Sequence, residues 1–127
     1  GGLQAVMTAH VAYFAYDRSG APATLSPAIL NELLRENLGF GGVVITDGLS
    51  MAGLTNDLTE SEAAVAALHA GCDLLLYPSD LEAVLSGVSG AMDDGSLHSD
   101  RIAEGVARLD EVLRGRHRTL GEWGLAA

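Results

Sequence analysis

One carboxylate, Asp47, stands where parallel α/β proteins bind their ligands. It follows the β-branched run at residues 43–45 (VVI) and Thr46, and it precedes Gly48. An uninterrupted β-branched run is typical of a strand buried on both faces in a parallel sheet. Ligands bind outside the carboxyl ends of such strands, which makes Asp47 the first candidate for chemistry. The structural alternative is an aspartate that caps the next turn.

A second candidate is His10, which follows the first predicted strand and therefore lies at the same end of the sheet as Asp47. It either lines a substrate pocket or is a packed or capping histidine. The other histidines are scattered without metal-ligand spacing, and the single cysteine, Cys72, excludes a cysteine-based zinc cluster and an internal disulfide. We therefore predict no metal and no cofactor, and we expect Cys72 to be a small buried residue.

Three strand–helix units must position these side chains. The predicted strands cover residues 3–9, 43–45 and 72–77. The predicted helices start at Ser26, at Thr59 with a capping box to Glu62, at residue 81 and at Ser99. Gly90 to Gly95 are expected to interrupt the third helical pattern, and Trp123 in the tail to pack back on the body. Asp73 opens the third strand at the opposite end from Asp47, so we interpret it as structural.

This alternation predicts a parallel sheet with right-handed crossovers. An eight-unit barrel needs about 250 residues, so three units plus a C-terminal helix amount to about half a barrel. We treat residues 1–127 as a single partial barrel domain. Such an unclosed barrel would expose two sheet edges and an apolar inner face, which favours self-association.

The composition restricts the classes of partner that this chain could bind. The chain has 127 residues, 48% of them hydrophobic, and a formal net charge of −10; all seven basic residues are arginines. This acidity argues against binding nucleic acid or an anionic membrane through charge. No apolar stretch reaches transmembrane length, and the opening residues lack a charged leader, so we expect a cytoplasmic protein. The chain does not begin with Met, which leaves room for an upstream segment.

Four segments occur together in a characteristic order: residues 6–11 (VMTAHV), 22–27 (PATLSP), 38–51 (LGFGGVVITDGLSM) and 70–76 (AGCDLLL). This series resembles the barrel domain of glycoside hydrolase family 3, especially its β-N-acetylhexosaminidase and β-glucosidase-like members. The resemblance implies a (β/α)₈ barrel of the TIM type, of which this chain looks like strands six to eight. It also implies a retaining glycosidase that hydrolyses terminal β-O-glycosidic bonds of a carbohydrate substrate, either an N-acetylglucosaminide or a glucoside.

The resemblance assigns roles to individual residues. Thr46-Asp47 matches the family's motif for the catalytic nucleophile, and a retaining glycosidase needs such a carboxylate beneath the sugar ring. Met51 would form the floor of the sugar site, and the alternative is that it packs in the core. His10 would line the substrate pocket. Where the family often has a second acid or an aromatic residue, this chain has Gly48. The family's acid/base, on an earlier loop or in a later region, has no match in this chain.

Two other readings compete with the glycosidase. In the first, the chain is a catalytically incomplete half-barrel that acts only as a structural or self-associating module. Its partner would be a second copy or the missing N-terminal half of the barrel. In the second, Asp47 is the phosphoacceptor of a receiver-like domain. That domain would need an acidic pair near the start and a lysine near the end, and the sequence has neither.

Overall fold

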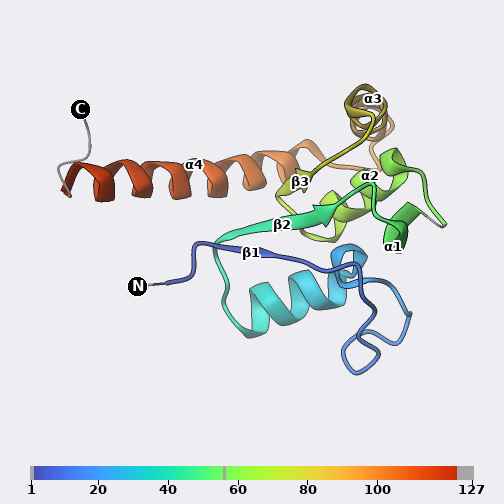
Figure 1. The fold of residues 1–127 in the computed structure, drawn as a ribbon, viewed down its shortest axis with the longest axis horizontal. Coiled ribbons are helices and arrows are strands. Elements are labelled where there is room, and N and C mark those ends of the chain that lie inside the picture. Colours follow the sequence, from blue (N-terminus) through green and yellow to red (C-terminus); the bar gives the residue numbers. More distant parts are fainter. Residues whose placement is uncertain (1, 56, 123–127) are drawn as a thin grey trace.

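The computed structural model describes residues 2–55 and 57–122, and its centre is one parallel sheet (Figure 1). Its strands are β1 (Ala5–Met7), β2 (Val43–Gly48) and β3 (Leu74–Leu76), in the spatial order β1-β2-β3. The register pairs Met7 with Ile45, and Ile45 with Leu74. Residues that pair in adjacent strands share a face, so these three side chains lie on the same side of the sheet.

Helical segments follow every strand. They are η1 (Ala23–Leu25), η2 (Ala28–Asn37), α1 (Ala52–Thr55), α2 (Glu60–Ala70), α3 (Leu81–Asp93) and α4 (Ser99–Glu122). This order confirms the predicted α/β class, with three strand–helix units and a C-terminal helix. Trp123, which was expected to pack on the body, lies outside the described residues.

The local helix signals are largely confirmed. Thr59 and Glu62 form the predicted capping box at the start of α2, and Gly71 ends that helix with a φ of 126°. The predicted interruption from Gly90 onward is wrong, because α3 continues through Gly90 to Asp93. A glycine inside a helix costs only about 1 kcal/mol, which the packing of the buried Val84 and Ala91 on the same helix offsets.

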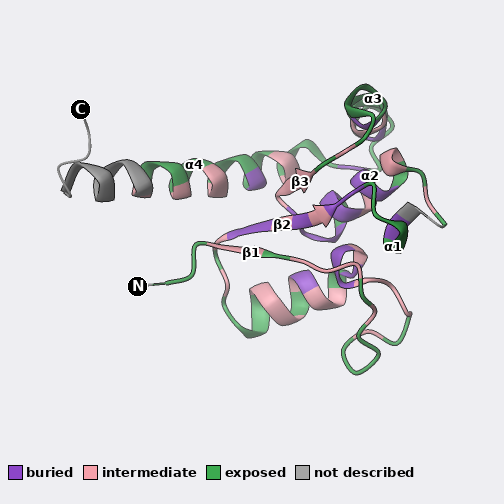
Figure 2. Cartoon of the chain, viewed as in Figure 1, coloured by how far each residue is buried: buried purple, intermediate pink, exposed green. Residues whose placement is uncertain are grey.

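A large part of the core packs on one face of the sheet. Val44 of β2 packs against Leu30 of η2 and Ala67 of α2, and Cys72 belongs to the same cluster. Figure 2 shows this concentration of buried residues along β2 and α2, whereas much of the outer surface of α3 and α4 is exposed. The prediction that Cys72 is buried is confirmed.

The opposite face is less covered, as expected of an incomplete barrel. β1 and β3 are the two outer strands of this three-stranded sheet, and Met7 on β1 is 58% exposed. Among the described residues, no helix is both long enough and apolar enough to pass through a membrane.

Asp73 joins the last helix to the amino ends of the strands. Its buried carboxylate accepts hydrogen bonds from Arg35 of η2 at 2.6 Å and from Arg101 and Arg108 of α4 at 2.8 and 2.9 Å. The Val44 N–H donates to the same carboxylate at 2.9 Å. This arrangement is consistent with the structural interpretation of Asp73, which fixes η2 and α4 against the sheet far from Asp47.

Candidate active site at the carboxyl ends of the strands

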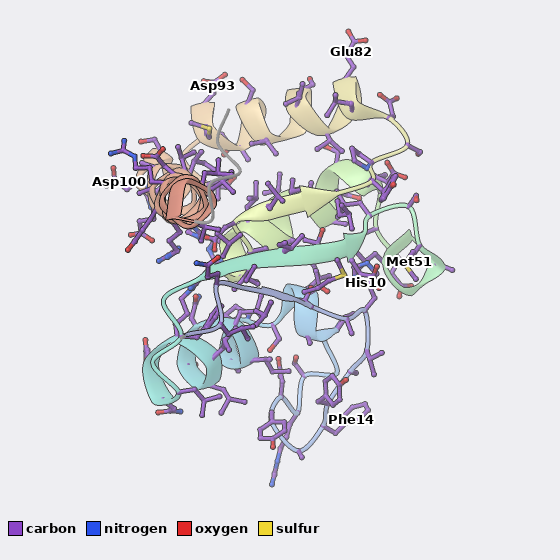
Figure 3. All side chains as sticks on the ribbon, turned by 60° about the vertical axis from the view of Figure 1, so that its left-hand side comes forward. His10, Phe14, Met51, Glu82, Asp93 and Asp100 are labelled. Atoms are coloured by element: carbon purple, nitrogen blue, oxygen red, sulfur yellow. The ribbon has the colours of Figure 1, made fainter. Side chains whose placement is uncertain are left out.

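The candidate residues gather at the carboxyl ends of the three parallel strands. Asp47 is the penultimate residue of β2, His10 follows β1 by three residues, and Tyr77 directly follows β3. Met51 lies in the turn between β2 and α1. Figure 3 shows His10 and Met51 close together at this end of the sheet, with Phe14 apart from them. The structure thus brings together the three site residues expected from the sequence.

His10 is held through both of its ring nitrogens. Nε2 lies 2.9 Å from the carbonyl oxygen of Gly48, and Nδ1 lies 2.9 Å from the hydroxyl of Thr24. That hydroxyl also lies 2.8 Å from the hydroxyl of Thr8, and Thr24 is fully buried. His10 therefore connects β1, η1 and the end of β2.

The partners of a neutral His10 fix its tautomer. A carbonyl oxygen can only accept, so Nε2 bears the hydrogen and donates it to Gly48. Nδ1 of a neutral ring then accepts from the Thr24 hydroxyl, and Thr24 in turn accepts from Thr8. The result is a directional chain of hydrogen bonds from Thr8 to the Gly48 carbonyl, which orients the imidazole within the site.

Gly48 is held on both sides. Its N–H donates to Oδ1 of Asp47 at 2.8 Å. Its carbonyl accepts from His10 and also from the N–H of Met51 at 3.1 Å, which closes a turn. Since the same residue contacts the Asp47 carboxylate, His10 and Met51, the position of this turn sets the geometry of all three.

Thr46 fixes the end of β2 against β3. Its buried hydroxyl accepts from the Leu76 N–H at 2.9 Å, and the Leu49 N–H donates to the Leu76 carbonyl at 2.9 Å. A side chain has thus replaced a backbone acceptor, at the point where the pairing of β2 with β3 becomes irregular. This replacement lets β2 bend away at Asp47 while it remains attached to β3.

A glycine supports His10 from the opposite side. A β-carbon built on Gly53 of α1 would lie 2.8 Å from the His10 β-carbon and 3.1 Å from its carbonyl oxygen. Real β-carbons do not approach other atoms so closely, and the shorter distance is to a part of His10 that cannot swing away. Glycine at this position therefore lets α1 pack directly on the residue that holds the Gly48 turn.

Sequence reasoning missed three contributors to this site: Thr24, Gly53 and Tyr77. Thr24 lies within one of the segments that indicated the family, but nothing local marks its side chain as a partner of His10. Gly53 is one of 16 glycines, and its role depends on a contact with a residue 43 positions earlier. The sequence pattern predicts Tyr77 as the end of a strand, and its unusual backbone is visible only in the structure.

A groove of about 790 Å³ lies at the other end of the strands, lined by residues that include Leu3, Phe40, Arg108 and Val112. It is separate from the candidate site, and its Arg108 is engaged with Asp73. Cys72 is also no candidate nucleophile, because burial, reinforced by the nearby Asp73 charge, raises the pKa of its thiol to about 12. Asp47 therefore remains the candidate for chemistry.

Comparisons with known proteins identify the family to which this chain is similar. Residues 1–112 match the family model described as the glycosyl hydrolase family 3 N terminal domain. A β-hexosaminidase from Methylobacillus flagellatus is 40% identical over 121 residues, which cover 91% of this chain and 31% of that protein. A β-N-acetylglucosaminidase/β-glucosidase from Cellulomonas fimi is 33% identical over 117 residues, covering 85% of this chain and 21% of that protein.

A solved structure of a family 3 enzyme is also similar to this chain. The glycoside hydrolase family 3 β-N-acetylglucosaminidase from Paenibacillus sp. str. FPU-7 superposes with a TM-score of 0.87 at 38% identity, covering 91% of this chain and 23% of that one. The chain thus spans between about a fifth and a third of the length of these relatives. The family match over most of the sequence shows that this chain belongs to glycosyl hydrolase family 3.

Proposed function

We propose that the protein hydrolyses terminal β-O-glycosidic bonds with retention of configuration, and that Asp47 is the nucleophile. The proposal rests on the position of the Asp47 carboxylate, at the carboxyl end of the central strand and anchored by the adjacent N–H of Gly48. One hydrogen bond to Oδ1 orients the carboxylate, and Gly48 has no side chain that would crowd a sugar ring. A fixed, ionised carboxylate is what the first step of a retaining glycosidase requires.

The chemistry has two steps. A carboxylate oxygen of Asp47 forms a bond to the anomeric carbon while the glycosidic bond breaks, and an acid/base group protonates the departing oxygen. Water then attacks the anomeric carbon, the ester bond to Asp47 breaks, and the acid/base takes the proton from water. We place the acid/base outside residues 1–127, which form one partial barrel domain in this proposal.

His10 and Met51 complete the proposed substrate site. Both ring nitrogens of His10 bind the protein, so it contributes by holding the Gly48 turn beneath the substrate. Met51 is 47% exposed and packs over the α-carbon of Gly48, where its thioether can contact the sugar. Neither role requires a metal or a cofactor.

We propose an N-acetylglucosaminide as the favoured substrate, with a glucoside as the alternative. The relatives described above bear the names β-hexosaminidase, β-N-acetylglucosaminidase and β-N-acetylglucosaminidase/β-glucosidase. Hydrolysis rates for matched nitrophenyl β-glycosides that differ only at C2 would decide between the two sugars.

The test of Asp47 is intact-mass analysis after incubation with a 2,4-dinitrophenyl 2-deoxy-2-fluoro-β-glucoside. Dinitrophenolate leaves without protonation, so the label can form without an acid catalyst. We expect one label on the unmodified protein, none on Asp47→Asn, and one on Asp93→Asn, which alters an exposed carboxylate on α3. The absence of a label on the unmodified protein, or a label on Asp47→Asn, would contradict the proposal.

A second candidate is a self-associating half-barrel, which the exposed Met7 on the less covered sheet face favours. Two copies that covered these faces would form a pseudo-barrel. Sedimentation of the protein should then show a dimer that Met7→Glu shifts to a monomer. A monodisperse monomer of the unmodified protein at high concentration would exclude this role.

A further inference from the structure

Tyr77 adopts a backbone conformation that its residue type disfavours. Its φ is 49°, and it is the one non-glycine residue with positive φ in the part of the chain that the structure describes. The left-handed region brings the β-carbon of an L-residue close to the following carbonyl, and an aromatic side chain gives no local compensation. Gly would adopt this conformation without strain, and Asn with less strain than an aromatic residue. Such strain persists where the surroundings impose it, and it gathers at functional sites.

Core packing does not account for the aromatic ring. Tyr77 is 76% exposed, the highest fraction among the large hydrophobic side chains of the described residues. The backbone of Tyr77 is therefore strained, and burial of the ring does not compensate for that strain. A function for the ring outside the core would explain why an aromatic residue is found here.

The ring originates beside the candidate nucleophile. A β-carbon built on Gly48 would lie 3.8 Å from the Tyr77 β-carbon, 3.5 Å from Met51 Cγ and 3.6 Å from its sulfur. Tyr77 and Met51 thus meet over the α-carbon of the residue that follows Asp47. Because Gly48 has no side chain, the space between these two residues is not filled by a β-carbon of Gly48.

We propose that Tyr77 is a substrate-binding residue, whose ring packs against the apolar face of the sugar that Asp47 attacks, opposite Met51. This proposal rests on the function proposed above and deepens it. An aromatic ring and a thioether offer two apolar surfaces to the C–H groups of a pyranose, while the Tyr hydroxyl can reach the polar rim. The left-handed backbone places the Tyr77 β-carbon beside Gly48, and in this proposal the exposed ring extends from there over the sugar.

The test compares Tyr77→Phe, which keeps the ring, with Tyr77→Gly, which removes the ring and also the backbone strain. The rate of Asp47 labelling by the 2,4-dinitrophenyl 2-deoxy-2-fluoro-β-glucoside is measured against reagent concentration, which separates reagent binding from the maximal rate. For Tyr77→Gly we expect about tenfold weaker binding, the size of one aromatic contact, with the maximal rate changed less than about twofold. Tyr77→Phe should bind within about twofold of the unmodified protein.

Thermal unfolding of the same variants separates a structural role from a binding role. Tyr77→Gly should melt at a temperature no lower than the unmodified protein, because relief of the left-handed strain offsets the greater entropy that glycine gives the unfolded chain. Unchanged binding by Tyr77→Gly would overturn the inference and leave the function standing. Equal losses in Tyr77→Phe and Tyr77→Gly, or a fall in melting temperature that accompanies the loss, would also overturn it. Failure to label the unmodified protein would overturn both proposals.

Discussion

Removal of the Asp73 carboxylate should destabilise the protein strongly. Three guanidinium groups, those of Arg35, Arg101 and Arg108, converge on this buried carboxylate at 2.6 to 2.9 Å, and they are themselves mostly buried. Among the described residues, Asp73→Ala would leave Arg35 and Arg101 without a counter-ion and Arg108 with only the exposed Glu104, 3.6 Å away. It would also leave the Val44 N–H without its acceptor. Loss of one partner from a buried ion pair costs about 3–5 kcal/mol, a large share of the roughly 5–15 kcal/mol that stabilises a domain.

Urea unfolding followed by circular dichroism at pH 7 would measure this cost, and the melting temperature should fall on the order of 10–20 °C. The control is Asp110→Ala, which removes an exposed carboxylate 2.7 Å from Arg114, four residues further along α4. Exposed pairs of this kind contribute about 0.3–0.5 kcal/mol. If Asp73→Ala lowered the free energy of unfolding by no more than Asp110→Ala, the proposed anchoring of η2 and α4 would be refuted.

The effect should also depend on pH. Burial acts to raise the pKa of Asp73, but the Val44 N–H and the guanidinium groups of Arg101 and Arg35 outweigh it, so the pKa falls below its usual value of 3.8. A carboxyl whose pKa is lower in the folded state stabilises the fold fully above the unfolded value and loses that contribution as the pH falls through the folded one. The stability difference between the unmodified protein and Asp73→Ala should therefore stay constant from pH 7 to about pH 5 and shrink below 3.8.

Three further predictions concern the candidate site and its surroundings. Gly53→Ala forces a β-carbon against His10 and should cost about 1–3 kcal/mol in urea unfolding, whereas Gly90→Ala, which meets open space in α3, should stabilise by about 0.5–1 kcal/mol. Thr24→Val removes the hydroxyl between Thr8 and His10 and should cost about 1–3 kcal/mol, while Thr24→Ser should restore most of it; equal losses would disprove the hydrogen-bonded chain. Cys72, with its raised pKa of about 12, should resist iodoacetamide at pH 8 in the folded protein and react after unfolding in urea; alkylation at equal rates in both states would contradict its burial.

The sequence by itself determined the order of the elements and the position of the main candidate. Alternation of short apolar runs with amphipathic segments predicted three strand–helix units, and the capping box of Thr59 and Glu62 located the start of α2. These signals are local, because backbone preferences and side-chain periodicity act over a few residues. The location of Asp47 at a strand end followed from the same local pattern, and the family was indicated by four segments in order.

Strand ends were less well predicted. The strand expected at residues 3–9 is observed as Ala5–Met7, and the one expected at residues 72–77 is observed as Leu74–Leu76. Apolar residues continue beyond both strands, so hydrophobicity alone could not mark where pairing stops. The end of a strand depends on its partner, as at Thr46, whose hydroxyl takes over a backbone bond of β3.

Only the tertiary structure decided how the site is held. The contacts of His10 with Thr24 and Gly48 join residues that are 14 and 38 positions apart. Asp73 accepts hydrogen bonds from arginines that are 28 to 38 positions away. No local pattern encodes such pairs, because they depend on how the helices dock on the sheet. The left-handed backbone of Tyr77 is decided in the same way: its own residue type argues against that conformation, and the strand end, Gly48 and Met51 around it determine the geometry.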